Sequence, residues 1–230
     1  MKKLVTLMLL SVLVLSSFAT VASASSAGLT QMTGTIVSET ENTIEVKPSN
    51  SDGGSVILNV DTSTYVVDCV TGIATPLKDR TNDKVSVYYG PVMTFSFPPK
   101  SNAVTIIVNV PDDAIPPRYA VAEAIDKADD EVRVTVDGGS LIVKIKRDNP
   151  ISPYLTRNIV TIDNIEVGSK LLMWYGFVAE SFPAQATSEK TVILGRGEGA
   201  AQGEASEEAQ QIVDEIKELV KRLKEILNAN

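Results

Sequence analysis

The chain has 230 residues, of which 43% are apolar and 22% charged, with 21 basic and 29 acidic residues. This composition suits two globular domains and fits neither a disordered chain nor a membrane protein. The net charge of −8 repels phosphate backbones, so nucleic acid is not expected as a partner.

The first 24 residues have the pattern of a secretory signal peptide. Lys2 and Lys3 precede an apolar run over residues 4–18, and small residues follow up to Ala24. The run is shorter than the roughly 20 residues that a transmembrane helix needs. We expect cleavage after Ala24, a mature chain that is secreted or held in the cell envelope, and no integral membrane segment after cleavage.

Short runs with alternating apolar and polar residues predict strands in both halves of the chain. In the first half they cover residues 33–38, 43–47, 55–60, 84–95 and 103–110. In the second half they cover residues 119–125, 131–136, 140–145, 170–178 and 190–194. Five short strands per half without a helical pattern between them predict a small, closed or nearly closed OB-like barrel.

Two stretches of the chain resemble one another and indicate a duplicated domain. Residues 65–93 align with residues 151–179 without a gap, and a Phe-Pro pair follows each stretch. The repeated strings are Tyr88-Tyr89-Gly90-Pro91-Val92 with Phe97-Pro98, and Trp174-Tyr175-Gly176-Phe177-Val178 with Phe182-Pro183. We expect Gly90 and Gly176 to lie where a strand bends sharply or another backbone approaches, because glycine otherwise weakens a strand.

The expected fold is therefore all-β, with two tandem five-stranded barrels and a C-terminal amphipathic helix. The first barrel with its N-terminal spacer covers residues 25–110, and the second covers residues 118–195. A proline-rich linker, residues 111–117, joins them, since prolines hold a chain extended.

Beyond the second barrel, a flexible linker at residues 196–205 leads into a predicted helix at residues 206–230. Its apolar residues recur at intervals of four and three, which predicts a coiled-coil or docking face. These residues are Ile212, Ile216, Leu219, Leu223 and Ile226. We expect self-association through this stripe, with docking onto a barrel as the alternative; the tail is so unlike the body that an acquired or engineered origin stays open.

Histidine is absent and Cys69 is the single cysteine, which removes Ser-His-Asp and Cys-His catalysis, thiolate clusters and intrachain disulfides. We expect Cys69 to be buried, with an intermolecular link as the alternative. No catalytic residue and no cofactor are expected.

Two sets of residues are candidates for binding. Tyr88, Tyr89, Trp174 and Tyr175 could form a stacking surface for sugars or peptides, with one ring of each pair in the core and the other exposed. Ordinary core packing is the alternative.

The acidic turn with Asp126, Asp129 and Asp130 could bind calcium, because a hard cation prefers several oxygen ligands. A solvated hairpin turn is the simpler interpretation, and it is favoured because the turn matches no known calcium-loop pattern.

The chain also resembles a family of exported Gram-positive bacterial proteins, over residues 33–195. Residues 88–94, 98–103, 153–161 and 182–187 carry the resemblance. In that family a two-copy β-domain precedes a copper amine oxidase N-terminal-like domain, which is non-catalytic. The helical tail stands here in its place, so the resemblance implies no copper or quinone chemistry.

These observations predict a secreted or cell-envelope-associated, non-enzymatic structural or binding module. The alternatives are a carbohydrate- or peptide-binding protein that uses exposed Tyr and Trp residues, and a subunit of a surface appendage. A cell-wall glycan or protein is the expected partner, beside further copies of the chain.

Overall fold

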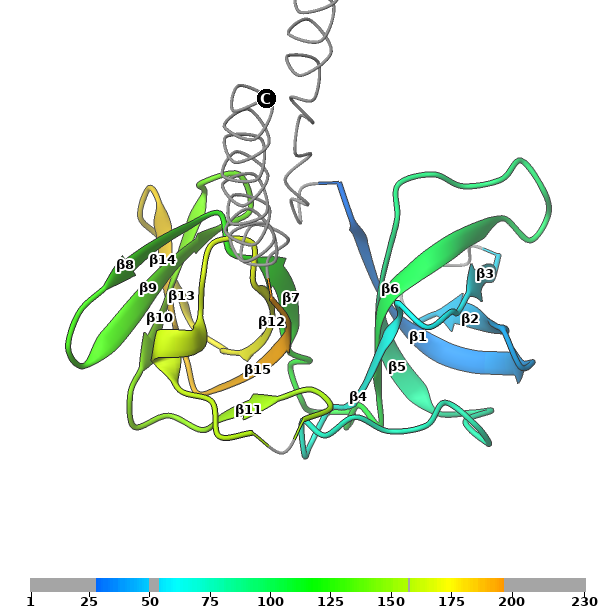
Figure 1. Cartoon of the computed structure of the whole chain (residues 1–230). Helices are drawn as coiled ribbons and strands as arrows, with labels where there is room; N and C mark the ends of the chain where they lie inside the picture. Colours follow the sequence, from blue (N-terminus) through cyan, green and yellow to red (C-terminus); the bar gives the residue numbers. More distant parts are fainter. Residues whose placement is uncertain (1–27, 50–53, 157, 197–230) are drawn as a thin grey trace, which may run out of the picture.

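The computed structural model describes residues 28–49, 54–156 and 158–196. Within these ranges the chain is all-β, with fifteen strands and one 3-10 helix. Figure 1 shows two β-rich halves lying side by side, the first in blue to green and the second in green to orange.

The first half contains a closed five-stranded barrel. β1 lies antiparallel between β2 and β5, β2 pairs with β3, and β5 pairs with β6. A parallel pairing of β3 with β6 closes the circle, and β4 pairs in parallel with the end of β6. The strands are β1 (Thr30–Glu39), β2 (Thr43–Pro48), β3 (Val56–Asn59), β4 (Tyr65–Asp68), β5 (Lys84–Tyr89) and β6 (Lys100–Val108). Closure leaves none of the five barrel strands as an exposed edge.

The apolar residues of the alternating pattern fill the interior of this barrel. In β2, Ile44 and Val46 are fully buried, whereas the residues between and beside them face outward. Ile36, Leu58 and Ile106 meet them from other strands to form one apolar core. The barrel therefore follows from the two-residue period of its strands.

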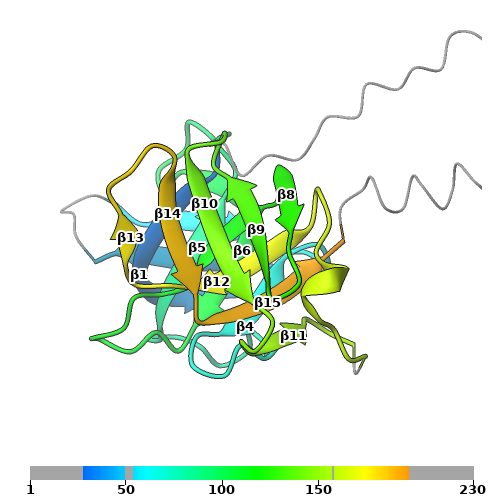
Figure 2. The ribbon, with the colours of Figure 1, turned by 90° about the vertical axis from the view of Figure 1, so that its left-hand side faces the viewer.

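The second half forms two sheets. Its strands are β7 (Arg118–Val121), β8 (Ala124–Lys127), β9 (Glu131–Val136), β10 (Leu141–Lys146), β11 (Ile151–Pro153), β12 (Lys170–Trp174), β13 (Val178–Ala179), β14 (Ala184–Ser188) and β15 (Lys190–Gly195). Figure 2 shows β13, β14, β10, β9 and β8 in this order across one face. The other sheet has the order β11-β15-β12-β7, and a single 3-10 turn, η1 (Ile162–Asn164), precedes β12.

The strand pairings of the second half have counterparts in the first. β9 lies between β8 and β10 as β2 lies between β1 and β3, and β12 lies between β7 and β15 as β5 lies between β1 and β6. β10 with β14 and β11 with β15 are parallel, as are β3 with β6 and β4 with β6. Ala122 and Glu123 interrupt the counterpart of β1, and Glu189 interrupts that of β6, which divides the second half into two sheets.

A third apolar cluster joins the two halves. Its buried members are Val67, Cys69, Tyr88, Ile107 and Val110 from the first half, and Tyr119, Val121, Leu172, Val192 and Leu194 from the second. The Trp174 Nε1 donates a hydrogen bond to the Cys69 carbonyl oxygen at 3.0 Å, and the Val66 backbone N donates one to the Tyr154 hydroxyl at 2.9 Å. The two halves are therefore joined by an apolar core that is separate from the core inside each half.

Cys69 is a free, buried cysteine in this cluster, as expected. Burial raises the pKa of its thiol above the ordinary value. A thiol in such surroundings is unreactive, so packing accounts for it.

No other backbone approaches Gly90 or Gly176 closely, so that part of the expectation is wrong; both glycines follow the end of a strand, β5 or β12. A Cβ at Gly90 would lie 4.0 Å from the nearest atom, the Ser101 Oγ, and one at Gly176 would lie 3.7 Å from the Ile115 Cδ1. The close backbone approach is at Gly34 in β1, where a Cβ would lie 2.3 Å from the Lys47 carbonyl oxygen. The pairing of β1 with β2, rather than the repeated pattern, is what requires a glycine.

Three predicted segments lie outside the described residues: the signal peptide at residues 1–24, the flexible linker from residue 197 to residue 205, and the helix at residues 206–230 with its stripe from Ile212 to Ile226. Within the described ranges, no helix has the length and apolar character needed to span a bilayer.

Candidate functional site

The aromatic residues of the repeated strings are packed between and within the two halves. Tyr89 lies in the core of the first half and Tyr175 in that of the second, whereas Tyr88 and Trp174 belong to the cluster that joins the halves. In each pair the two neighbouring side chains point to opposite sides of their strand, as expected. The side that was expected to face solvent is covered by the other half of the protein.

These four residues therefore offer no open stacking surface. Tyr88, Tyr89 and Tyr175 are buried, and burial raises the pKa of the Tyr88 hydroxyl above its ordinary value. Trp174 is partly buried, and the Lys190 Nζ lies 4.7 Å from its ring centroid, a cation–π contact. The expectation of an exposed ring in each pair does not hold.

The acidic turn does not gather its carboxylates. The Asp126 carboxylate faces the Arg133 guanidinium at 3.7 Å, while the Asp129 and Asp130 carbonyl oxygens accept hydrogen bonds from Arg147. In the part of the chain that the structure describes, no group of three or more acidic, His or Cys side chains could hold a metal ion. The simpler interpretation, a solvated turn, fits this arrangement.

The exposed aromatic residues are phenylalanines. The chain has five, and the four within the described ranges are 81–110% exposed: Phe95, Phe97, Phe177 and Phe182. Phenylalanine is normally among the most buried residues, because burying its side chain is worth about 1.5–3 kcal/mol. Four exposed rings are therefore a candidate interaction surface.

All four rings lie on two loops in corresponding positions. Residues 90–99 join β5 to β6, and residues 175–183, which include β13, lead from β12 to β14. Each loop contains Ser-Phe-Pro with a cis Phe-Pro bond, and the serine hydroxyl donates to the proline carbonyl oxygen. The hydrogen bond from the Ser96 Oγ to the Pro98 carbonyl oxygen measures 2.8 Å, and the one from the Ser181 Oγ to the Pro183 carbonyl oxygen measures 2.7 Å. Phe97 and Phe182 therefore lie in turns of the same kind.

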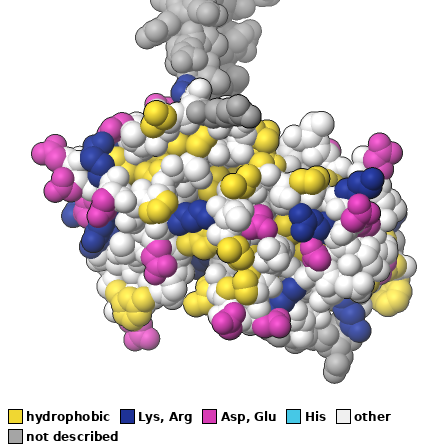
Figure 3. Space-filling view, turned by 90° about the horizontal axis from the view of Figure 1, so that it is seen from below, with side chains coloured by type: hydrophobic (Ala, Val, Ile, Leu, Met, Phe, Trp, Pro, Cys, Tyr) yellow, Lys and Arg dark blue, Asp and Glu magenta, His cyan; other side chains and the backbone are white. Residues whose placement is uncertain are grey.

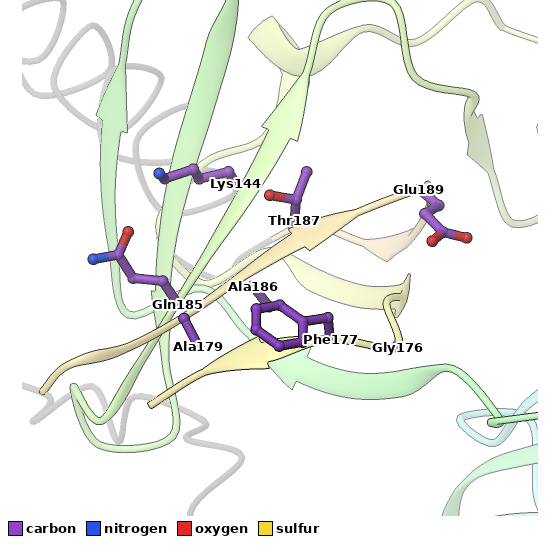
Figure 4. Close-up of a pocket in the computed structure, with 8 residues that line it drawn as sticks. All are labelled: Lys144, Gly176, Phe177, Ala179, Gln185, Ala186, Thr187 and Glu189. Atoms are coloured by element: carbon purple, nitrogen blue, oxygen red, sulfur yellow. The ribbon is translucent and has the colours of Figure 1, made fainter. Parts of the chain in front are cut away.

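One of these loops borders a groove in the second half. The groove has a volume of about 400 Å³, and Figure 4 shows the side chains that line it. They are Lys144 from β10, Gln185, Ala186 and Thr187 from β14, Ala179 from β13, and Gly176, Phe177 and Glu189 from the connecting segments. We call this the β14 groove.

The register of the strands brings the polar residues of the β14 groove together. β10 and β14 are parallel, and Lys144 is the partner of Thr187. Along β14 and beyond it, Gln185, Thr187 and Glu189 alternate with buried residues, so all three face the groove. The groove therefore combines one exposed ring with an amide, a hydroxyl, an ammonium and a carboxylate.

The first half carries a different pair of side chains at the corresponding position. Asn59 on β3 and Asn102 on β6 are register partners, as Lys144 and Thr187 are. The Asn59 Nδ2 donates to the Asn102 Oδ1 at 2.8 Å, so the two side chains satisfy each other. The halves therefore share the phenylalanine loops but differ in what lies beside them.

A second hollow lies between the halves. It has a volume of about 780 Å³ and includes Tyr65 from the first half with Tyr154, Leu155 and Ile159 from the second. Figure 3 views this junction from below: hydrophobic side chains gather along the middle of the face, with basic and acidic side chains interspersed. Neither sign of charge dominates there.

Sequence reasoning missed the exposed phenylalanines. The available signal was the recurrence of Phe-Pro after each repeated string, which marks a constrained turn rather than a buried strand. Comparison of the chain with family models, curated proteins and solved structures gives no match. The function has to be inferred from the loops, the groove and the sequence.

Proposed function

We propose that this protein is a secreted or cell-envelope-associated module without catalytic activity that binds its partner through the two phenylalanine loops. The observation that carries the proposal is that every phenylalanine within the described ranges is exposed, and that all of them lie on corresponding loops. The cores take up the rings of Tyr88, Tyr89, Tyr119 and Tyr175 but none of the four phenylalanine rings, and exposed apolar rings gathered on two loops are typical of a binding surface.

The proposal includes two tandem OB-like barrels from a duplication. The pairings of the second half support a second barrel, interrupted at two strands, with the first-half connectivity. Barrels of this type bind ligands through the loop between their fourth and fifth barrel strands and through the face of the second and third. In the first half the fourth and fifth barrel strands are β5 and β6, and the loop between them carries Phe95 and Phe97. A fold by itself carries many functions.

Export and family membership belong to the same proposal. The signal-peptide pattern at residues 1–24 and the resemblance to exported Gram-positive proteins support a place at or beyond the cell surface. A cell-wall glycan or protein is the partner that such a location offers, and a surface-appendage role is the rival.

Removing the rings is expected to weaken binding to isolated cell walls at least tenfold. We expect the mature chain to co-sediment with Gram-positive sacculi, and the variant with Phe95, Phe97, Phe177 and Phe182 replaced by serine to lose at least tenfold in affinity. Burial of even one ring is worth more than the roughly 1.4 kcal/mol that tenfold requires.

Ile73→Ser is the matched control, because Ile73 is exposed but lies outside both loops. It should bind as the unmodified chain does. Sedimentation of the four-serine variant to the same extent would overturn the proposal, and so would a mature chain that ignores cell walls and assembles into fibres under the electron microscope.

Self-association through the C-terminal stripe stays a prediction. We expect the mature chain to sediment as an oligomer at micromolar concentration and the double variant Leu219→Glu, Leu223→Glu to sediment as a monomer, because charges at these positions oppose helix pairing. Monomers in both cases would contradict the prediction and favour docking of the tail onto a barrel.

A further inference from the structure

We propose that the β14 groove binds a neutral glycan chain, one per protein chain. This inference rests on the proposed function and names the ligand class of one of its two loops. Four features of the groove carry it: the exposed ring of Phe177, the row of polar side chains, the opposite charges of Lys144 and Glu189, and the strand pairings of its floor.

The aromatic wall comes from Phe177. Its ring is 81% exposed and lies alongside Ala186 and Thr187 in the groove (Figure 4). An aromatic ring presents a broad apolar face, and the face of a pyranose ring that carries C–H groups can stack on it. A ligand that covers Phe177 would therefore bury apolar area that the folded chain leaves in water.

The polar row supplies both donors and acceptors. The amide of Gln185 and the hydroxyl of Thr187 can each donate and accept, Lys144 donates, and Glu189 accepts. Within the described part of the chain, none of these four side chains makes a hydrogen bond or ion pair with another residue. Sugar hydroxyls also donate and accept, so they match this row.

The charges favour a neutral ligand. Lys144 and Glu189 contribute one charge of each sign to the groove. An anionic polymer would be attracted to the ammonium and repelled by the carboxylate, whereas hydroxyl groups can bond to both.

The length of the row suits a short oligosaccharide. Gln185, Thr187 and Glu189 follow one another at every second residue, which spans roughly 13 Å at about 3.3 Å per residue. The three side chains lie in a line across the groove in Figure 4. A chain of sugar units can follow this line with successive rings near successive side chains.

The backbone argues against a peptide added as a further strand. The floor of the groove is β14, which pairs in parallel with β10 and antiparallel with β13. At Gln185 and Ala186 both hydrogen-bonding edges of β14 are occupied, so at this part of the floor only side chains are left to read the ligand. A peptide therefore cannot add as a further strand directly onto β14 at these two residues.

The experiment is calorimetric titration of the mature chain with three probes: a neutral N-acetylglucosamine hexamer, a neutral glucose hexamer and an oligogalacturonate of the same length. We expect a neutral hexamer to bind with one site per chain. Phe177→Ala should weaken it at least tenfold, and Gln185→Leu and Thr187→Val should each weaken it severalfold. Since all three positions are exposed, the variants should keep the thermal unfolding temperature of the unmodified chain.

The control variant is Ile73→Ala, which removes an exposed apolar side chain that lies outside both phenylalanine loops and outside the β14 groove. It should leave hexamer binding unchanged. Equal binding by Phe177→Ala and the unmodified chain, preference for the oligogalacturonate, or binding of neither neutral hexamer would overturn the inference.

Failure of this inference is distinguishable from failure of the proposed function. A chain that needs its phenylalanines to bind sacculi but ignores both neutral hexamers retains the binding function and loses the glycan assignment. Titration with a mixed peptide pool gives the remaining outcome: peptide binding that is lost in Phe177→Ala would assign the groove to a peptide instead.

Discussion

Replacing Leu172 with alanine is expected to lower the free energy of unfolding by about 2–5 kcal/mol, the range for removing a large side chain from a packed core. Leu172 is fully buried in the cluster that joins the two halves. Its loss leaves a cavity between them, because the surrounding strands are held by ladders on both sides and cannot close on it. Chemical denaturation followed by the fluorescence of Trp174, which lies in the same cluster, measures the change.

Leu155→Ala is the matched control, since Leu155 is 76% exposed. It should change the free energy of unfolding by less than about 0.5 kcal/mol. We expect one cooperative transition for the unmodified chain because the halves share the cluster. Equal stability of the two variants would contradict the view that the halves are joined by a true core.

Replacing Gly34 with alanine is expected to cost about 1–3 kcal/mol or more, the usual range for overpacking. A Cβ there would lie 2.3 Å from the Lys47 carbonyl oxygen and 2.8 Å from the Val46 Cγ1. Neither atom can yield freely, because Lys47 pairs with Thr35 in the β1–β2 ladder and Val46 is fully buried. Thermal and chemical denaturation of the purified variant measure the cost.

Gly90→Ala is the comparison. The site has room for a Cβ, and its φ is not in the left-handed region, so alanine should be neutral or slightly stabilising there. A larger loss of stability at Gly90 than at Gly34 would restore the expectation drawn from the repeated pattern and contradict the geometry of β1.

The two binding proposals depend on the same cluster. Trp174 and Leu172 lie at the end of β12, directly before the loop that carries Phe177. The Lys190 Nζ reaches across the junction and donates to the Val70 carbonyl oxygen at 3.2 Å. Contacts between the halves thus support one rim of the β14 groove. Because Leu172→Ala disturbs these contacts, it tests stability and should not be used to test binding.

The amino-acid sequence by itself determined the all-β character and most strand positions. Alternation is a local property, and it predicted β2, β9 and β10 to within a residue or two at each end. The parallel strands β4, β11 and β14 escaped prediction because they are short and take their partners from far along the chain. The single predicted strands over residues 119–125 and 170–178 each proved to be two.

Only the tertiary structure decided which residues face solvent at the site. The alternation of Tyr88 with Tyr89 and of Trp174 with Tyr175 was readable, but the docking of one half on the other buried the side that local pattern leaves open. Phenylalanine favours burial on average, so no local sequence rule predicts that Phe97 and Phe182 are exposed. Long-range pairing likewise placed the close approach at Gly34. Packing between segments far apart in the sequence determines burial, and alternation along one strand carries no information about what covers either side.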